Sequence, residues 1–135
     1  MSAERRPLPV DRLVLAALFV TALVVAQLTA AKLLAFGLPF SIPVTGSALV
    51  LPGAALAYAL TFFASDCYAE LYGRRAAQEL VNVAFAMNFV VLLLVQSTIA
   101  APAANPGFAG TFASVLGAST NIVAGSLLAY IVSQN

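Results

Sequence analysis

Two carboxylates, Asp66 and Glu70, stand four residues apart near the end of an apolar run of helical length, in the stretch FFASDCYAELYGRR. Residues four apart lie on one face of a helix, and Arg74 continues that row. Ionisable groups at the margin of hydrocarbon are costly and usually carry function, and acids in the last turns of a helix oppose its dipole. We expect this pair to need a partner: a donor-rich solute, a coupling proton or Lys32. The alternative is an interfacial Glu70–Arg74 pair, with Asp66 solvated among lipid headgroups.

The next apolar stretch carries an amide and two rings on one side. At about 100° per residue, Asn82, Phe85 and Phe89 fall on the same side of a helix. Amides within a bilayer normally face protein or water, because lipid cannot satisfy their hydrogen bonds. Amides beside aromatic rings could hold a flat heterocycle through edge hydrogen bonds and stacking. The sequence leaves open the alternative that such amides only join helices.

A third pattern lies in the last apolar stretch, where Gly117, Asn121 and Gly125 follow one another at four-residue steps. Small residues at this spacing let helix backbones approach closely in a membrane. We expect a structural packing role for Gly117 and Gly125. Asn121 is the member of the row that could also face a solute path.

The composition identifies the environment of these groups. The chain has 135 residues, 62% of them hydrophobic and only 8% charged, whereas a soluble domain carries about 25% charged residues. It is therefore an integral membrane protein. A net charge of +1 argues against nucleic-acid binding. With no His and one Cys, zinc sites and disulfide frameworks are excluded within the chain. No soluble-enzyme motif is present, so we expect no enzymatic activity, no metal and no cofactor. A homo-oligomer is left open.

Apolar runs of about 20 residues predict an all-α, polytopic membrane protein with a single transmembrane domain over 1–135. Four transmembrane helices are predicted, over residues 13–36, 52–72, 76–100 and 111–135. Gly and Pro residues at 37, 39, 43 and 46 mark the first loop. Gly73 suits the end of the second helix, as a structural residue.

Arginines set the predicted orientation. Arg5, Arg6 and Arg12 precede the first predicted helix, and Arg74 and Arg75 separate the second from the third. The positive-inside rule then places the N-terminus in the cytoplasm of a multi-pass protein of the cell (plasma or inner) membrane. The last predicted span ends without a flanking charge, from which we expect further helices beyond this sequence.

Residues 60–77, LTFFASDCYAELYGRRAA, resemble the signature of the queuosine precursor transporter family, also called the vitamin uptake transporter family. The matching positions are Ser65, Asp66, Glu70, Tyr72, Gly73, Arg74 and Arg75. Ser65 stands where many members carry Thr, which keeps the hydroxyl. The segment LTAAKLLAF, the proline-led second helix and the final SQN are also similar to the family pattern.

This resemblance implies a six-helix membrane protein that takes up 7-deazaguanine precursors of modified tRNA bases, such as 7-cyano-7-deazaguanine. Two helices would then lie beyond residue 135. A carboxylate of Glu70 or Asp66 would match the adjacent ring N–H and amine of such a purine-like substrate. Asn82 would bind another edge, and Phe85 or Phe89 would stack on the ring. Two alternatives remain: a substrate-binding subunit of an energy-coupling-factor vitamin transporter, and a structural membrane assembly subunit.

Overall fold

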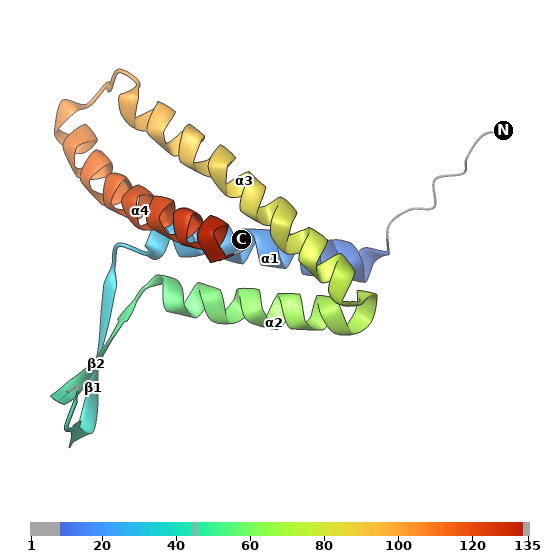
Figure 1. Cartoon of the computed structure of the whole chain (residues 1–135). Coiled ribbons are helices and arrows are strands. Elements are labelled where there is room, and N and C mark those ends of the chain that lie inside the picture. The colour runs from blue at the N-terminus through green and yellow to red at the C-terminus, as the bar shows by residue number, and fades with distance from the viewer. Residues whose placement is uncertain (1–8, 45, 134–135) are drawn as a thin grey trace.

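The computed structural model describes residues 9–44 and 46–133, without the side chain of Ile42. The described residues form four helices and one β-hairpin (Figure 1). In chain order, these elements are α1 (Val10–Thr29), β1 (Leu33–Ile42), β2 (Gly46–Pro52), α2 (Ala54–Tyr72), α3 (Arg74–Ala100) and α4 (Pro106–Ser133). Arg5, Arg6 and the last two residues of the helix predicted over 111–135 lie outside the described part.

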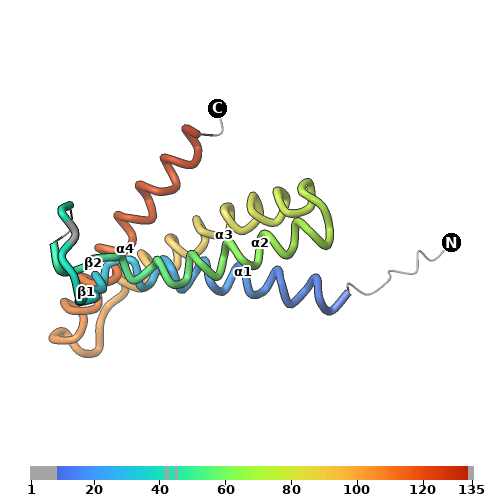
Figure 2. Tube along the Cα trace, turned by 90° about the horizontal axis from the view of Figure 1, so that it is seen from below, coloured from blue at the N-terminus to red at the C-terminus, as the bar shows by residue number. Residues whose placement is uncertain are grey.

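Mostly small side chains form the centre of the helix bundle. Phe19 of α1, Ala64 of α2 and Ala84 of α3 make one buried cluster. A second cluster lies between α1 and α2, at Ala26, Ala30 and Ala54. Alanines at helix contacts allow close approach of the backbones, and α1 and α2 accordingly lie side by side in both views (Figures 1 and 2).

Gly53 brings the start of α2 against the end of α1. Its N–H donates a hydrogen bond of 2.6 Å to the carbonyl oxygen of Lys32. A Cβ built on Gly53 would lie 2.6 Å from the carbonyl oxygen of Thr29, closer than real Cβ atoms come. The backbone of Gly53 is α-helical in conformation, with φ −57° and ψ −26°, so glycine is required here for space and not for a special dihedral angle.

The hairpin is the main correction to the predicted helices. The first helix was predicted over 13–36, but α1 ends at Thr29, and residues 33–36 belong to β1. Strands β1 and β2 pair antiparallel from Leu33 opposite Pro52 to Gly37 opposite Ala48. Regular pairing breaks between Gly37 and Ile42, a stretch that contains Pro39, whose nitrogen cannot donate to a ladder. The hairpin projects away from the helices (Figure 1).

The opposite end of the α1–α2 pair is closed by an arginine. The Nε of Arg12 donates a hydrogen bond of 2.8 Å to the hydroxyl oxygen of Tyr68. The guanidinium carbon also lies 5.8 Å from the ring centroid of Tyr68 and 5.4 Å from that of Tyr72. Gly73, with φ 88°, ends α2, and its N–H binds the carbonyl oxygen of Ala69 at 2.9 Å. The structure thus shows the helix end that the sequence predicts at Gly73.

Three of the described helices, α1, α3 and α4, are long and apolar enough to cross a membrane. The protein is therefore a membrane protein with a mostly helical fold. The prediction of four such spans is met only in part. The second predicted span is a helix of 19 residues, α2, but Asp66, Glu70 and three tyrosines lower its hydropathy. In Figure 2, α4 turns away from the other three helices as it runs toward its C-terminal end.

Candidate functional site

A cleft lies among the four helices, formed by two adjoining hollows. The larger has a volume of about 300 Å³, and the smaller of about 160 Å³. Both are lined by Leu23, Tyr58, Phe85, Asn88 and Tyr130. We refer to the two together as the cleft. A volume of about 300 Å³ is at the lower end of the usual range for small-molecule sites.

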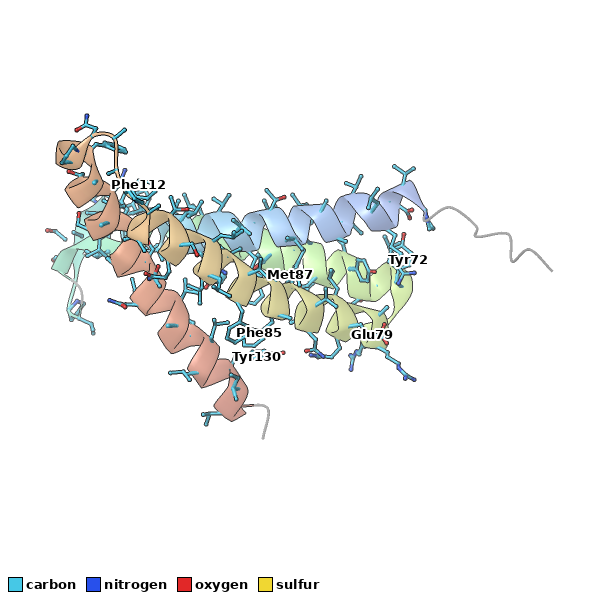
Figure 3. The ribbon with its side chains drawn as sticks, turned by 90° about the horizontal axis from the view of Figure 1, so that it is seen from above. Tyr72, Glu79, Phe85, Met87, Phe112 and Tyr130 are labelled. Atoms are coloured by element: carbon cyan, nitrogen blue, oxygen red, sulfur yellow. The ribbon has the colours of Figure 1, made fainter. Side chains whose placement is uncertain are left out.

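An aromatic pair forms one wall of the cleft. The rings of Phe85 and Tyr130 have centroids 4.1 Å apart and planes inclined by 32°. Figure 3 shows these side chains pointing toward one another from α3 and α4. The hydroxyl of Tyr130 donates a hydrogen bond of 3.0 Å to Oδ1 of Asn82. This contact links the last turn of α4 to the N-terminal half of α3.

Polar groups line the cleft from two other helices. Gln27 of α1 is 5% exposed and lines the smaller hollow. Neither amide atom of Gln27 has a hydrogen-bond partner within the described residues. Thr61 and Ser65 of α2 line the larger hollow, but their hydroxyls donate to the carbonyl oxygens of Tyr58 and Phe62, at 2.7 and 2.9 Å. Gln27 is therefore a buried cleft residue whose hydrogen-bonding capacity is left unused.

The cleft lies at mid-depth in the bundle. Phe85 is eleven residues beyond Arg74, the start of α3, which corresponds to about 16 Å along a helix. The hydrocarbon core of a bilayer is about 30 Å thick. A helix that enters the hydrocarbon core at Arg74 would carry Phe85 to about the bilayer midplane, the depth at which transporters bind their solutes.

A comparison with known protein families identifies the class of protein to which this chain belongs. The family described as "Putative vitamin uptake transporter" matches residues 52–135, more than half of the chain. The chain belongs to this family. Comparisons with curated proteins and with solved structures gave no match. The match covers α2, α3 and α4, and confirms the resemblance seen at residues 60–77.

Membership in the vitamin uptake transporter family indicates a membrane transporter with a small-molecule solute, and it favours transport over catalysis. The cleft has the properties that such a function requires. It is mostly apolar, it lies inside a bundle of membrane helices, and it contains a few buried polar groups that could orient a solute. No group of metal-ligating side chains occurs in the described part of the chain.

Of the residues predicted on α3, Phe85 lines the cleft, whereas Asn82 and Phe89 do not. Asn82 accepts hydrogen bonds from Tyr130 and from Nε2 of Gln78, at 3.0 Å each. Phe89 is 45% exposed and touches Phe85 edge-on, with centroids 5.8 Å apart. The buried side of α3 is instead centred on Ala77, Ala84 and Asn88, which lies about 100° around the helix from the predicted row.

The two predicted acids lie outside the cleft. Asp66 and Glu70 are both exposed, and neither lines either hollow. The alternative Glu70–Arg74 pair is also not formed, and the ion pair found among the described residues joins Arg75 Nε and Glu79 Oε1 at 3.8 Å. Asp66 is four residues beyond Phe62, which lines the cleft, so it lies one turn away on the same face.

The glycine row of α4 faces away from the packed side. The buried residues of α4 are Ser119, Val123 and Leu127, roughly opposite Gly117, Asn121 and Gly125 at 100° per residue. Asn121 is exposed and lines neither hollow. A Cβ built at Gly117 or Gly125 would meet no described atom within 4 Å. The described chain therefore does not itself provide the close helix contact expected at these glycines.

Sequence reasoning missed three residues of the site: Gln27, Asn88 and Tyr130. A signal for Asn88 was present, because it extends the alanine row of Ala77 and Ala84 by one turn. On α4, Tyr130 lies three residues beyond Leu127, the last buried residue of the helix, but that burial is known only from the structure. Gln27 has no such signal, since its neighbours in the sequence are apolar on all sides.

Proposed function

We propose that this protein imports a flat, purine-like solute, 7-cyano-7-deazaguanine or a related 7-deazapurine used in tRNA modification. The observation that carries the proposal is the mid-depth cleft with an aromatic wall and buried amides. The signature around Asp66 and the family membership support the choice of solute class. No covalent chemistry is involved: the solute binds in the cleft, and access alternates between the two sides of the membrane.

The aromatic pair gives the cleft a flat surface. A heteroaromatic solute gains stacking energy against rings such as Phe85 and Tyr130, beyond the burial of its apolar area. The Tyr130–Asn82 hydrogen bond holds the second ring in place. In this proposal Asn82 supports the site through Tyr130 and does not bind the solute itself, while Phe89 supports Phe85 from the side.

In this proposal, Asp66 and Glu70 do not bind the edge of the purine. Their exposure and their position outside the cleft argue against direct contact with the solute, so we assign them instead the response to a coupling proton. Asp66 is the better placed of the two, because it lies one turn beyond Phe62 and directly follows Ser65, both of which line the cleft. A protonation change there is close enough to influence the α2 wall of the cleft.

The orientation is also part of the proposal. We place the N-terminus and the α2–α3 turn in the cytoplasm and the hairpin on the outer side of the cell membrane. Arg12, Arg74 and Arg75 lie at one end of the bundle, and the hairpin lies at the other (Figure 1). This distribution of arginines is the one that the positive-inside rule favours.

Uptake of labelled 7-cyano-7-deazaguanine tests the proposal, in cells that cannot synthesise it and that express the full-length gene product. We expect accumulation with the wild type and a loss of about tenfold or more with Phe85→Ala, because the stacking surface and its apolar area are removed. The matched control is Phe108→Ala, since Phe108 is 64% exposed and lines neither hollow of the cleft.

The same experiment separates the alternatives. Uptake that requires added coupling ATPases would identify a substrate-binding subunit of an energy-coupling-factor transporter. An absence of uptake in every host, together with no thermal stabilisation of the purified protein by any 7-deazapurine, would contradict the proposal and favour a structural subunit.

A further inference from the structure

The buried amide of Gln27 is a feature of the described chain that its own contacts do not explain. The side chain is 5% exposed, and both Nε2 and Oε1 lack a hydrogen-bond partner among the described residues. An unpaired polar group in an apolar interior is unfavourable, and nearly all buried polar side chains have a partner. A near-isosteric apolar residue would be more stable at this position, unless the amide serves a purpose.

Two spaces adjoin the Gln27 side chain, and only one can admit a solute. On one side is a hollow of about 10 Å³, also lined by Ser119, whose hydroxyl is unpaired as well. That volume is at the limit of what holds one water molecule, about 10–15 Å³. On the other side is the 160 Å³ part of the cleft, shared with Phe85, Asn88 and Tyr130.

The position of Gln27 complements the ring wall. Gln27 and Asn88 both line the smaller hollow, from α1 and α3, and Asn88 is 7% exposed. Phe85 and Tyr130 line the same hollow. A flat solute that lies against the rings therefore presents its edge to groups on the surrounding helices. Gln27 is seventeen residues along α1 from Val10, which places it about 25 Å from the arginine-rich end of the bundle.

The chemistry of an amide defines the edge that it recognises. A primary amide carries an acceptor oxygen beside a donor NH₂ group, so it pairs in two hydrogen bonds with an edge that has a donor next to an acceptor. A lactam, N–H beside C=O, has this pattern. A carboxylate has acceptors alone and requires two adjacent donors instead.

We propose that Gln27 is a solute-binding residue of the cleft, and that its amide pairs with the lactam-type edge of a flat heterocycle stacked near Phe85 and Tyr130. The inference rests on the proposed function for its site and goes beyond it by assigning the polar recognition to an amide at the hairpin-side end of the cleft. It replaces the carboxylates predicted from the sequence as the groups that bind the solute edge.

The test is equilibrium binding to the purified full-length protein in lipid nanodiscs, for wild type, Gln27→Met, Gln27→Asn and Gln96→Met. Methionine matches glutamine in length and flexibility without its hydrogen bonds. Gln96→Met is the matched control, because Gln96 is exposed and lines neither hollow. The probes are 7-cyano-7-deazaguanine, guanine and riboflavin, which all carry a donor beside an acceptor on a flat ring. Thermal stability of each variant without probe reports on folding.

We expect Gln27→Met to weaken binding by about tenfold or more, as for the loss of one or two hydrogen bonds. Its thermal stability without probe should equal or exceed that of the wild type, because an unpaired amide has been removed. Gln96→Met should bind as the wild type does. Gln27→Asn keeps the amide on a side chain that is one methylene shorter, so it should bind the probe with intermediate strength. If the methionine variant does not fold, binding by Gln27→Asn tests whether Gln27 contacts the solute.

The binding results that would contradict the role of Gln27, the proposed solute, or both can be told apart. Equal binding by wild type and both folded Gln27 variants overturns the role of Gln27, while leaving the proposed function intact. Binding of riboflavin but of no purine, lost in Gln27→Met, supports the amide subsite and overturns the proposed solute. Binding of none of the three probes overturns both.

Discussion

At the scale of single residues, burial and hydrogen bonding distinguish polar side chains whose roles cannot be told apart from the sequence. Asp66 and Glu70 draw attention by their charge, yet both are exposed and outside the cleft. Gln27 is inconspicuous in the sequence, yet it is buried and unpaired. Charge is visible in the sequence, whereas an unsatisfied hydrogen bond depends on which helices surround the side chain.

The acids give the first prediction at this scale. Asp66→Asn should bind 7-cyano-7-deazaguanine with the affinity of the wild type but accumulate it about tenfold less, because the residue lies outside the cleft and is proposed to respond to a coupling proton. Binding in nanodiscs and uptake in cells are the two measurements. Glu70→Gln is examined in parallel, and Glu79→Gln, which breaks the exposed Arg75–Glu79 pair, is the control.

Wild-type uptake by both acid variants, at normal expression, would remove the carboxylates from the mechanism. A loss of equilibrium binding in either variant would instead return them to the solute site, in agreement with the role that the family resemblance implies.

Some residues of the site can be predicted from the sequence, and others cannot. Phe85 was predicted, because aromatic rings and amides on one side of an apolar helix are a recognisable pattern. Asn88 was not predicted, because the position of the packed side of α3 depends on where Ala64 of α2 and Phe19 of α1 meet Ala84. Tyr130 enters the site only because α4 folds back onto α3.

At the scale of elements, hydropathy predicted the helices well and the hairpin poorly. The predicted helices over 52–72 and 76–100 lie within about two residues of α2 and α3. The segment after α1 was divided between helix and loop, because its apolar residues lack the regular alternation that identifies a strand. Pro52, expected in the first turn of the second helix, is instead the last residue of β2.

Gly53 provides a prediction for the junction of these elements. Gly53→Ala should destabilise the protein by about 1–3 kcal/mol, as overpacking does elsewhere, because the added Cβ would lie 2.6 Å from a backbone oxygen of α1. Thermal unfolding in nanodiscs measures the effect. Gly110→Ala is the control, since nothing lies within 4 Å of the Cβ built there. Equal stability of the two variants would show that α1 and α2 are not in such close contact.

At the scale of the whole molecule, membership in the vitamin uptake transporter family and three membrane-length helices agree on a membrane protein. The sequence predicted this from composition alone, since few charged residues leave no water-exposed surface. It also predicted that the arginines gather at one end. The shape of the bundle, with the hairpin projecting at one end and α4 diverging (Figures 1 and 2), could not be predicted, because it depends on contacts between distant residues.

Cysteine labelling tests the orientation of the whole chain. In a Cys67→Ala background, Ser47→Cys in the hairpin should react with a membrane-impermeant maleimide on intact cells, whereas Glu79→Cys near the start of α3 should react only after permeabilisation. Glu79 is suitable because acids contribute little to topology. The reverse labelling pattern would place the arginines outside and contradict the proposed orientation.

The contact of Arg12 with two tyrosine rings has a consequence for the transport cycle. Since one side chain of α1 is hydrogen-bonded to Tyr68 and lies over the rings of both Tyr68 and Tyr72, the two helices cannot part at that end without uncovering both rings. The conformation described here is therefore held together at the arginine-rich end, and in the proposed transport cycle solute release in that direction would require parting Arg12 from α2.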